Sequence, residues 1–145
     1  MENKQHFTVV AGLIWRSDGF ILISKRLPSG SQANKWELPG GKVEEGESLP
    51  DALEREIFEE LNLSVEAGEE FGRVVHDYGN KIVTLSGIHV LYTNGEPEAR
   101  EVSEWRWIHP DDLLSYQFPP ANERLFQFNW STPPKGWGVK RLASG

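Results

Sequence analysis

One segment, residues 40–63, constrains the fold of this chain more than any other: a glycine-rich turn leads into a short acidic helix. Ser48 is a good N-cap, and Pro50 is tolerated in the first turn of a helix. Asn62 suits the left-handed residue that closes a helix. We therefore predict a helix over Leu49–Leu61, about three and a half turns long.

This predicted helix carries three carboxylates on one face. Glu56, Glu59 and Glu60 are spaced i, i+3 and i+4, so they share a stripe roughly 100° wide. An adjoining apolar strip is suited to packing on a sheet: Leu53, Ile57 and Leu61. Oxygen ligands with no His or Cys nearby favour hard cations, Mg²⁺ or Mn²⁺, over zinc. The alternative interpretation is a solvated acidic surface, which is common for charge runs.

The spacing of this segment distinguishes the two interpretations. From Gly41 onward it fits G-x5-E-x7-R-E-U-x-E-E-x-G-U, where U is a bulky apolar residue. The matching positions are Glu47, Arg55, Glu56, Ile57, Glu59, Glu60 and Leu63. Asn62 departs from the pattern, which has Gly at this position. The departure affects the expected end of the helix and none of the acidic residues. The segment resembles the Nudix box, the signature of the Nudix hydrolases, and a match at this many positions is highly specific.

Length and composition exclude several classes of protein. The 145 residues suit one domain, and the absence of cysteine removes disulfides and thiol catalysis. A net charge of -7 argues against binding long nucleic acid, which needs a basic face. A small anionic ligand remains compatible, because divalent cations can offset its charge. The polar N-terminus and the lack of a membrane-length apolar run predict a cytoplasmic protein without membrane contact, and nothing indicates a protein partner.

Strands are predicted on both sides of the helix. In order they are His6–Trp15, Phe20–Arg26, Trp36–Leu38, Phe71–Tyr78, Lys81–Tyr92 and Val102–Ile108. An Asp-Gly pair predicts a hairpin between the first two. Further helical segments are predicted from His109 and over Ala121–Phe128. This order favours an α/β/α sandwich with a mixed sheet, the fold that the Nudix resemblance also implies. We assign residues 1–130 to the domain and residues 131–145 to an extended or mobile tail.

The resemblance implies hydrolysis of a nucleoside diphosphate linked to a further group. It also implies that Glu56, Glu59 and Glu60, with the Gly40 carbonyl, bind Mg²⁺ or Mn²⁺. The expected catalytic residues are Glu56, Glu59 and Arg55. Glu56 is the candidate base, although the sequence alone does not distinguish a role in metal binding from a role in proton abstraction.

Two residues have roles that stay open at this stage. Arg55, supported by Glu47, would orient the glutamates, or it forms a plain i, i+4 helix pair with Glu59. Glu101 resembles the additional metal-binding glutamate that some of these enzymes carry outside the box. Alternatively, Glu101 is an ordinary loop carboxylate in an acidic chain.

A second motif bears on the substrate. Residues 118–123, FPPANE, together with Ala33-Asn34-Lys35, resemble the MutT branch, whose members hydrolyse 8-oxo-dGTP to the monophosphate and pyrophosphate. An asparagine at the position of Asn122 reads the base in that branch. Its carboxamide can accept from the N7–H of oxidised guanine while donating to O6. The alternative role for Asn122 is an N-cap of the terminal helix.

The remaining substrate candidates are cations. Arg26 matches a substrate-side arginine of the MutT branch, and Lys81 is a weaker candidate. Lys42, just after the glycines, is a candidate contact for a phosphate. Each is otherwise an ordinary surface cation. The leading hypothesis is a metal-dependent 8-oxo-dGTP pyrophosphohydrolase that acts on a small nucleotide. The alternatives are a Nudix hydrolase of CTP, dCTP or another nucleotide, and a catalytically inactive Nudix domain used for binding.

Overall fold

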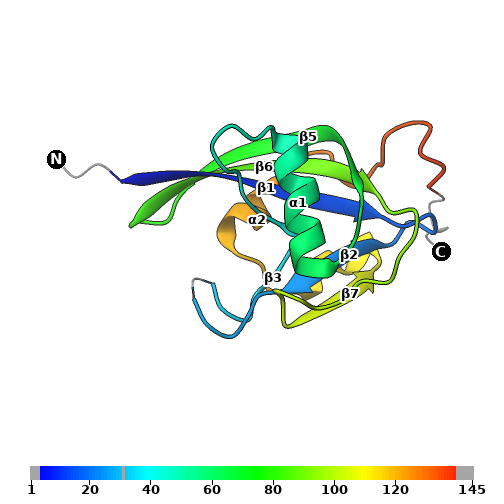
Figure 1. Ribbon diagram of the computed structural model, residues 1–145, viewed down its shortest axis with the longest axis horizontal. Helices are drawn as coiled ribbons and strands as arrows, with labels where there is room; N and C mark the ends of the chain where they lie inside the picture. The colour runs from blue at the N-terminus through cyan, green and yellow to red at the C-terminus, as the bar shows by residue number, and fades with distance from the viewer. Residues whose placement is uncertain (1–3, 31, 140–145) are drawn as a thin grey trace.

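The computed structural model describes residues 4–30 and 32–139, which form one mixed sheet with helices on both of its faces (Figure 1). The strands are β1 (Gln5–Trp15), β2 (Ile21–Lys25), β3 (Trp36–Glu37), β4 (Gly40–Lys42), β5 (Glu66–Asp77), β6 (Lys81–Leu91) and β7 (Glu104–Ile108). The helices are α1 (Leu49–Leu61), the 3-10 helix η1 (Pro110–Ser115) and α2 (Pro120–Leu125). The sheet order is β3-β2-β1-β6-β5, while β4 pairs with β1 and β7 pairs with β2. The predicted α/β fold with a mixed sheet is confirmed.

Helix α1 begins and ends where predicted, because residues next to its two ends cap it. The Ser48 hydroxyl accepts a hydrogen bond from the Asp51 N–H at 3.2 Å. Asn62 adopts a left-handed conformation with φ of 55°, so it closes the helix as a glycine would. The apolar strip of α1 is fully buried against the sheet: Leu53, Ile57 and Leu61.

Strand β1 lies at the centre of the sheet and holds its two halves together. It pairs in parallel with β6 from Gln5 to Trp15. It pairs antiparallel with β2 through the predicted hairpin, whose Gly19 has a φ of 88°. Its C-terminal half is buried from Val10 to Trp15. The start of β1 and the β5–β6 hairpin extend beyond the rest of the sheet (Figure 1).

The glycine-rich segment before α1 differs from our prediction of a turn. Gly40 and Gly41 form part of strand β4, in which Ala11 pairs with Gly40 and Val10 pairs with Gly41. A side chain at Gly40 would collide with the Val10 carbonyl oxygen. Gly40 is therefore required by the close approach of two backbones.

Several other boundaries also differ from the prediction. Strand β5 begins at Glu66, whereas we predicted a start at Phe71. The prediction missed its first half because that half is polar and two register shifts interrupt the alternation of its side chains. The segment after His109 forms a 3-10 helix, and α2 ends at Leu125 rather than at Phe128. In the part of the chain described, no helix combines the length and apolar character needed to cross a membrane.

The two faces of the sheet bury separate clusters. One cluster lies under α1, and the other lies under α2 and the C-terminal segment. The described part of that segment, up to residue 139, has no regular secondary structure, although Trp130 and Trp137 pack against the second cluster. Residues 140–145 of the predicted tail and residues 1–3 lie outside the described residues. The division at residue 130 stays a prediction.

Candidate active site

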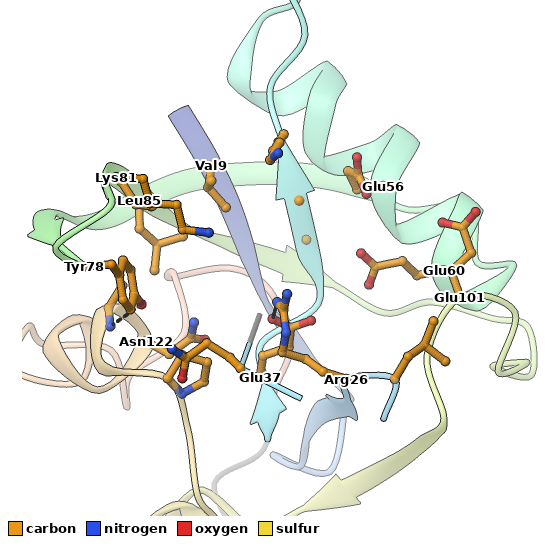
Figure 2. Close-up of a pocket in the computed structure, with 18 of the residues that line it drawn as sticks. Val9, Arg26, Glu37, Glu56, Glu60, Tyr78, Lys81, Leu85, Glu101 and Asn122 are labelled. Atoms are coloured by element: carbon orange, nitrogen blue, oxygen red, sulfur yellow. Dashed lines mark hydrogen bonds and ion pairs between the residues drawn. The ribbon is translucent and has the colours of Figure 1, made fainter. Parts of the chain in front are cut away.

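A pocket of about 340 Å³ opens between β4, α1 and the start of α2. Figure 2 shows that polar side chains gather on two opposite sides of it. The carboxylates on one side, called here the acidic end, are Glu56, Glu60 and Glu101. The opposite side, called the amide end, is formed by Tyr78, Lys81 and Asn122. Val9 and Leu85, which are paired between β1 and β6, contribute an apolar wall to the same pocket.

Glu60 is the most buried carboxylate of the acidic end. It is only 8% exposed, and its Oε2 has no hydrogen-bond partner among the described residues. Burial, together with the nearby carboxylates of Glu37 and Glu56, raises the pKa of Glu60 well above its usual value. A buried carboxylate oxygen without a partner is costly. This oxygen is therefore well suited to accept a cation from the pocket.

Glu56 lies against the backbone of β4. A side chain at Gly41 would collide with the Glu56 carboxylate, so the glycine makes room for it. Burial raises the pKa of Glu56, and the adjacent Arg55 partly opposes that shift. Arg55 Nη1 donates to Glu56 Oε1 at 2.9 Å. Glu56 is therefore held in a fixed position with a carboxylate that gains a proton more readily than usual.

Arg55 binds the side chains around α1 into one network. Its Nε and Nη2 donate to both oxygens of Glu47 at 2.7 and 2.9 Å, and Nη2 also donates to the Lys42 carbonyl at 3.0 Å. This bidentate pair lowers the pKa of Glu47 to about 2 and raises the pKa of Arg55. Arg55 also contacts Glu59 at 3.2 Å. The plain helix pair is thus only one part of its interactions.

The carboxylate stripe predicted for α1 divides in the structure. Glu56 and Glu60 line the pocket, whereas Glu59 does not and its side chain is 44% exposed. Across residues 4–30 and 32–139, no three His, Cys, Asp or Glu side chains already converge closely enough to hold a metal ion. The donor set is nevertheless made of oxygen atoms alone, which fits a hard cation.

Glu101 reaches the acidic end although it is distant in sequence. The carbonyls of the last turn of a helix lack intrahelical partners. In α1 the Glu60 carbonyl accepts from the N–H groups of Arg100 and Glu101 at 3.0 and 3.3 Å. The Leu61 carbonyl accepts from the Glu98 N–H at 2.9 Å. The end of α1 therefore holds the loop that carries Glu101.

Asn122 is the central residue of the amide end. It is 7% exposed, and its Oδ1 accepts from the Leu38 N–H at 3.1 Å. The prediction that it could be an N-cap is wrong, because Pro119 caps α2 and makes no side-chain bond there. Tyr78 supports the same turn, since its hydroxyl accepts from the Ala121 N–H at 3.1 Å. One lone pair of Asn122 Oδ1 and its NH₂ donors remain to face the pocket.

Glu37 is a pocket residue that sequence reasoning missed. It lies between the two ends (Figure 2), with a side chain 14% exposed, and accepts from Arg26 Nη1 at 2.8 Å. Burial raises its pKa, and Arg26 opposes the shift. Alternation along a strand could have found it, because Trp36 and Leu38 on either side are buried and Glu37 must face the other way.

The structure brings most of the predicted site residues together. Four side chains proposed to contact substrate line one pocket: Arg26, Lys42, Lys81 and Asn122. Gly40, Glu56, Glu60 and Glu101 line it as well. Arg55 and Glu59 do not line it, and they lie behind the acidic end within the network described above.

Comparison with known proteins places this geometry in a family. The sequence model of the NUDIX domain family matches residues 10–128 of this chain. An 8-oxo-dGTP diphosphatase from Haemophilus influenzae is 37% identical over 123 residues, which is 85% of this chain and 90% of that protein. A CTP pyrophosphohydrolase from Escherichia coli is 37% identical over 119 residues, 82% of this chain and 87% of that protein.

Solved structures agree with this assignment. The crystal structure of a MutT protein from Methanosarcina mazei Go1 superimposes with a TM-score of 0.79 at 28% identity. The match covers 88% of this chain and 94% of that one. The carboxylate-lined pocket therefore lies in a fold shared with these proteins over nearly its whole length. The chain belongs to the NUDIX domain family and is a Nudix hydrolase.

Proposed function

We propose that this protein is a metal-dependent pyrophosphohydrolase that converts 8-oxo-dGTP into 8-oxo-dGMP and pyrophosphate, and so removes an oxidised nucleotide from the precursor pool. The observation that carries the proposal is the position of Asn122. Its carboxamide faces the pocket that holds the box carboxylates and is fixed by the Leu38 N–H. The name of the Haemophilus influenzae relative supports the same substrate.

The groups that would hold Mg²⁺ or Mn²⁺ are Glu56, Glu59, Glu60, Glu101 and the Gly40 carbonyl. The unpartnered, buried Oε2 of Glu60 and the all-oxygen donor set fit a hard cation. When bound, such ions supply positive charge that offsets the phosphate oxygens and favours ionisation of the attacking water. Glu59 would have to leave its contact with Arg55 to take part.

Glu56 would accept the proton of the attacking water. As the water oxygen bonds to phosphorus, the α–β phosphoanhydride bond breaks, and the two products are the nucleoside monophosphate and pyrophosphate. The raised pKa of Glu56 suits a group that must gain a proton near neutral pH. Arg55, itself fixed by Glu47, holds Glu56 in place during this step.

Asn122 would distinguish oxidised guanine from guanine. In 8-oxoguanine N7 carries a hydrogen, so Oδ1 of Asn122 can accept from N7–H while its NH₂ group donates to O6. In guanine N7 carries a lone pair, which repels the Oδ1 atom of Asn122. A bidentate contact of this kind discriminates between bases by about 1–3 kcal/mol.

The test is pyrophosphate release from 8-oxo-dGTP, dGTP and CTP with Mg²⁺, with Glu56→Gln as the blank and a chelator as the metal control. A preference for 8-oxo-dGTP over dGTP that Asn122→Ala removes is the expected result. Equal or faster release from CTP would favour the second candidate, a CTP or dCTP pyrophosphohydrolase like the Escherichia coli relative. A folded protein that releases pyrophosphate from none of them would leave the binding-domain alternative.

A further inference from the structure

The two pocket lysines form no ion pair in the part of the chain that the structure describes. Lys42 and Lys81 both line the pocket, in a chain with 22 Asp and Glu residues and a net charge of -7. Within residues 4–30 and 32–139, neither ammonium group lies within 4.0 Å of a carboxylate oxygen, whereas Arg26 of the same pocket is paired with Glu37. Neither lysine is therefore held by an ion pair with a described residue.

Both ammonium groups lie instead over the ring of Phe7. Lys42 Nζ is 4.1 Å from the ring centroid, and Lys81 Nζ is 5.8 Å from it. Lys81 Nζ is also 5.8 Å from the centroid of the Tyr78 ring. The sheet explains this arrangement, because Phe7 is on β1, between β4, which carries Lys42, and β6, which carries Lys81.

An aromatic ring holds a cation differently from a carboxylate. The negative face of the ring attracts the ammonium group but takes up none of its three N–H donors in a strong hydrogen bond. A lysine side chain has a long flexible stem, so ordering it costs entropy when it binds a ligand. A lysine already ordered over a ring meets part of that cost before the ligand arrives.

We infer that Phe7 is a positioning residue that holds Lys42 and Lys81 over the pocket, so that their free N–H donors meet oxygen atoms of a bound nucleotide. The inference rests on the proposed function for the class of ligand. Lys42 follows Gly41 near the acidic end, where it would face the phosphate chain. Lys81 belongs to the amide end, where it would face the nucleoside.

The test compares Phe7→Leu with Phe7→Tyr. Phe7→Leu keeps an apolar side chain but removes the ring, and we expect kcat/KM to fall about fivefold, chiefly through a higher KM. Phe7→Tyr keeps the ring and should recover most of that loss. The matched control is Phe20→Leu, which breaks the contact of Arg16 with the Phe20 ring outside the pocket and should leave kcat/KM unchanged. Thermal unfolding of each variant checks that it is folded.

A mutant cycle shows whether Phe7 acts through the lysines. In a Lys42→Gln, Lys81→Gln background, Phe7→Leu should lower kcat/KM by less than about twofold. A fivefold loss that persists in that background, or an equal loss in Phe7→Tyr and Phe7→Leu, would overturn the inference.

Binding of inorganic pyrophosphate, measured by calorimetry with Mg²⁺, separates this inference from the proposed function. The affinity of Phe7→Leu for pyrophosphate should be about threefold weaker than that of the wild type, because Lys42 is less ordered. Unchanged affinity, or no binding by the wild type, overturns the role of Phe7, whichever triphosphate is hydrolysed. Failure of the wild type to hydrolyse any triphosphate overturns the proposed function alone.

Discussion

The acidic end and the amide end of the pocket are built in different ways. Apart from Glu101, the acidic end comes from one continuous segment, and the charged network of Arg55 and Glu47 supports it. The amide end combines the β5–β6 turn with α2, and neutral hydrogen bonds from the backbone fix Tyr78 and Asn122. Under the proposed function, reaction chemistry and substrate choice would be carried by separate parts of the chain, so we expect mutations to change them separately.

The largest effect is expected at the acidic end. Glu56→Gln should lower kcat about 10³-fold, because the amide cannot accept the proton of the attacking water. The ratio of activities on 8-oxo-dGTP and CTP should stay the same. Steady-state kinetics on both substrates measure this. Glu45→Gln is the control, because it makes the same change of net charge at an exposed glutamate outside the pocket. A shift in the ratio would show that the two ends are not separate.

The next largest effect is expected at the amide end. Asn122→Ala should lower kcat/KM for 8-oxo-dGTP about 10- to 100-fold and affect dGTP much less, because only the oxidised base uses both hydrogen bonds. Stability should fall by about 1 kcal/mol as the Leu38 N–H loses its partner. Asn122→Asp is the control, since it keeps an acceptor for Leu38 but has no donor for O6. Equal losses on both substrates would assign Asn122 to structure alone.

A smaller effect is expected between the two ends, at Glu37. Glu37→Gln keeps the shape of the side chain but removes the charge that pairs with Arg26 at 2.8 Å. We expect KM to rise about three- to tenfold for 8-oxo-dGTP and CTP alike, because Arg26 is held less firmly toward the pocket. The two KM values provide the measurement. A rise confined to one nucleotide would place Glu37 in the amide end and sharpen the boundary.

The smallest effect on activity is expected at His89, which lies outside both ends. It is 3% exposed, and its Nδ1 accepts from Trp15 Nε1 at 3.0 Å. Burial lowers its pKa from 6.5 to about 4. Between these values the unfolded chain binds a proton that the folded chain does not, so stability falls as the pH falls from 6.5 to 4, by about 3 kcal/mol in total.

The variant that tests this is His89→Gln, which keeps an acceptor for Trp15 but does not titrate. Urea unfolding at pH 4.5 and pH 7 should show a smaller difference in the free energy of unfolding for the variant than for the wild type. Activity at pH 7 should be unchanged. The same pH dependence in both proteins would contradict the assignment to His89.

What the sequence could predict follows the same division of the pocket. The limits of α1 were predictable because Ser48 and Asn62 act within a few residues of the helix ends. The division between Glu59 and Glu60 was not, because a helical period places both on one stripe and only the packing of β4 decides which enters the pocket. The bond from the Leu38 N–H to Asn122 joins positions 84 residues apart, so no local pattern could reveal it.

The two roles of Glu60 limit how the loop that carries Glu101 can be exchanged. Its side chain enters the pocket, while its carbonyl accepts the N–H groups of Arg100 and Glu101. A loop exchanged from a relative must therefore reproduce both backbone contacts, or it will carry its own glutamate to the wrong place. Fraying of the last turn of α1 would break the same contacts. The position of Glu101 in the pocket therefore depends on an intact C-terminal turn of α1.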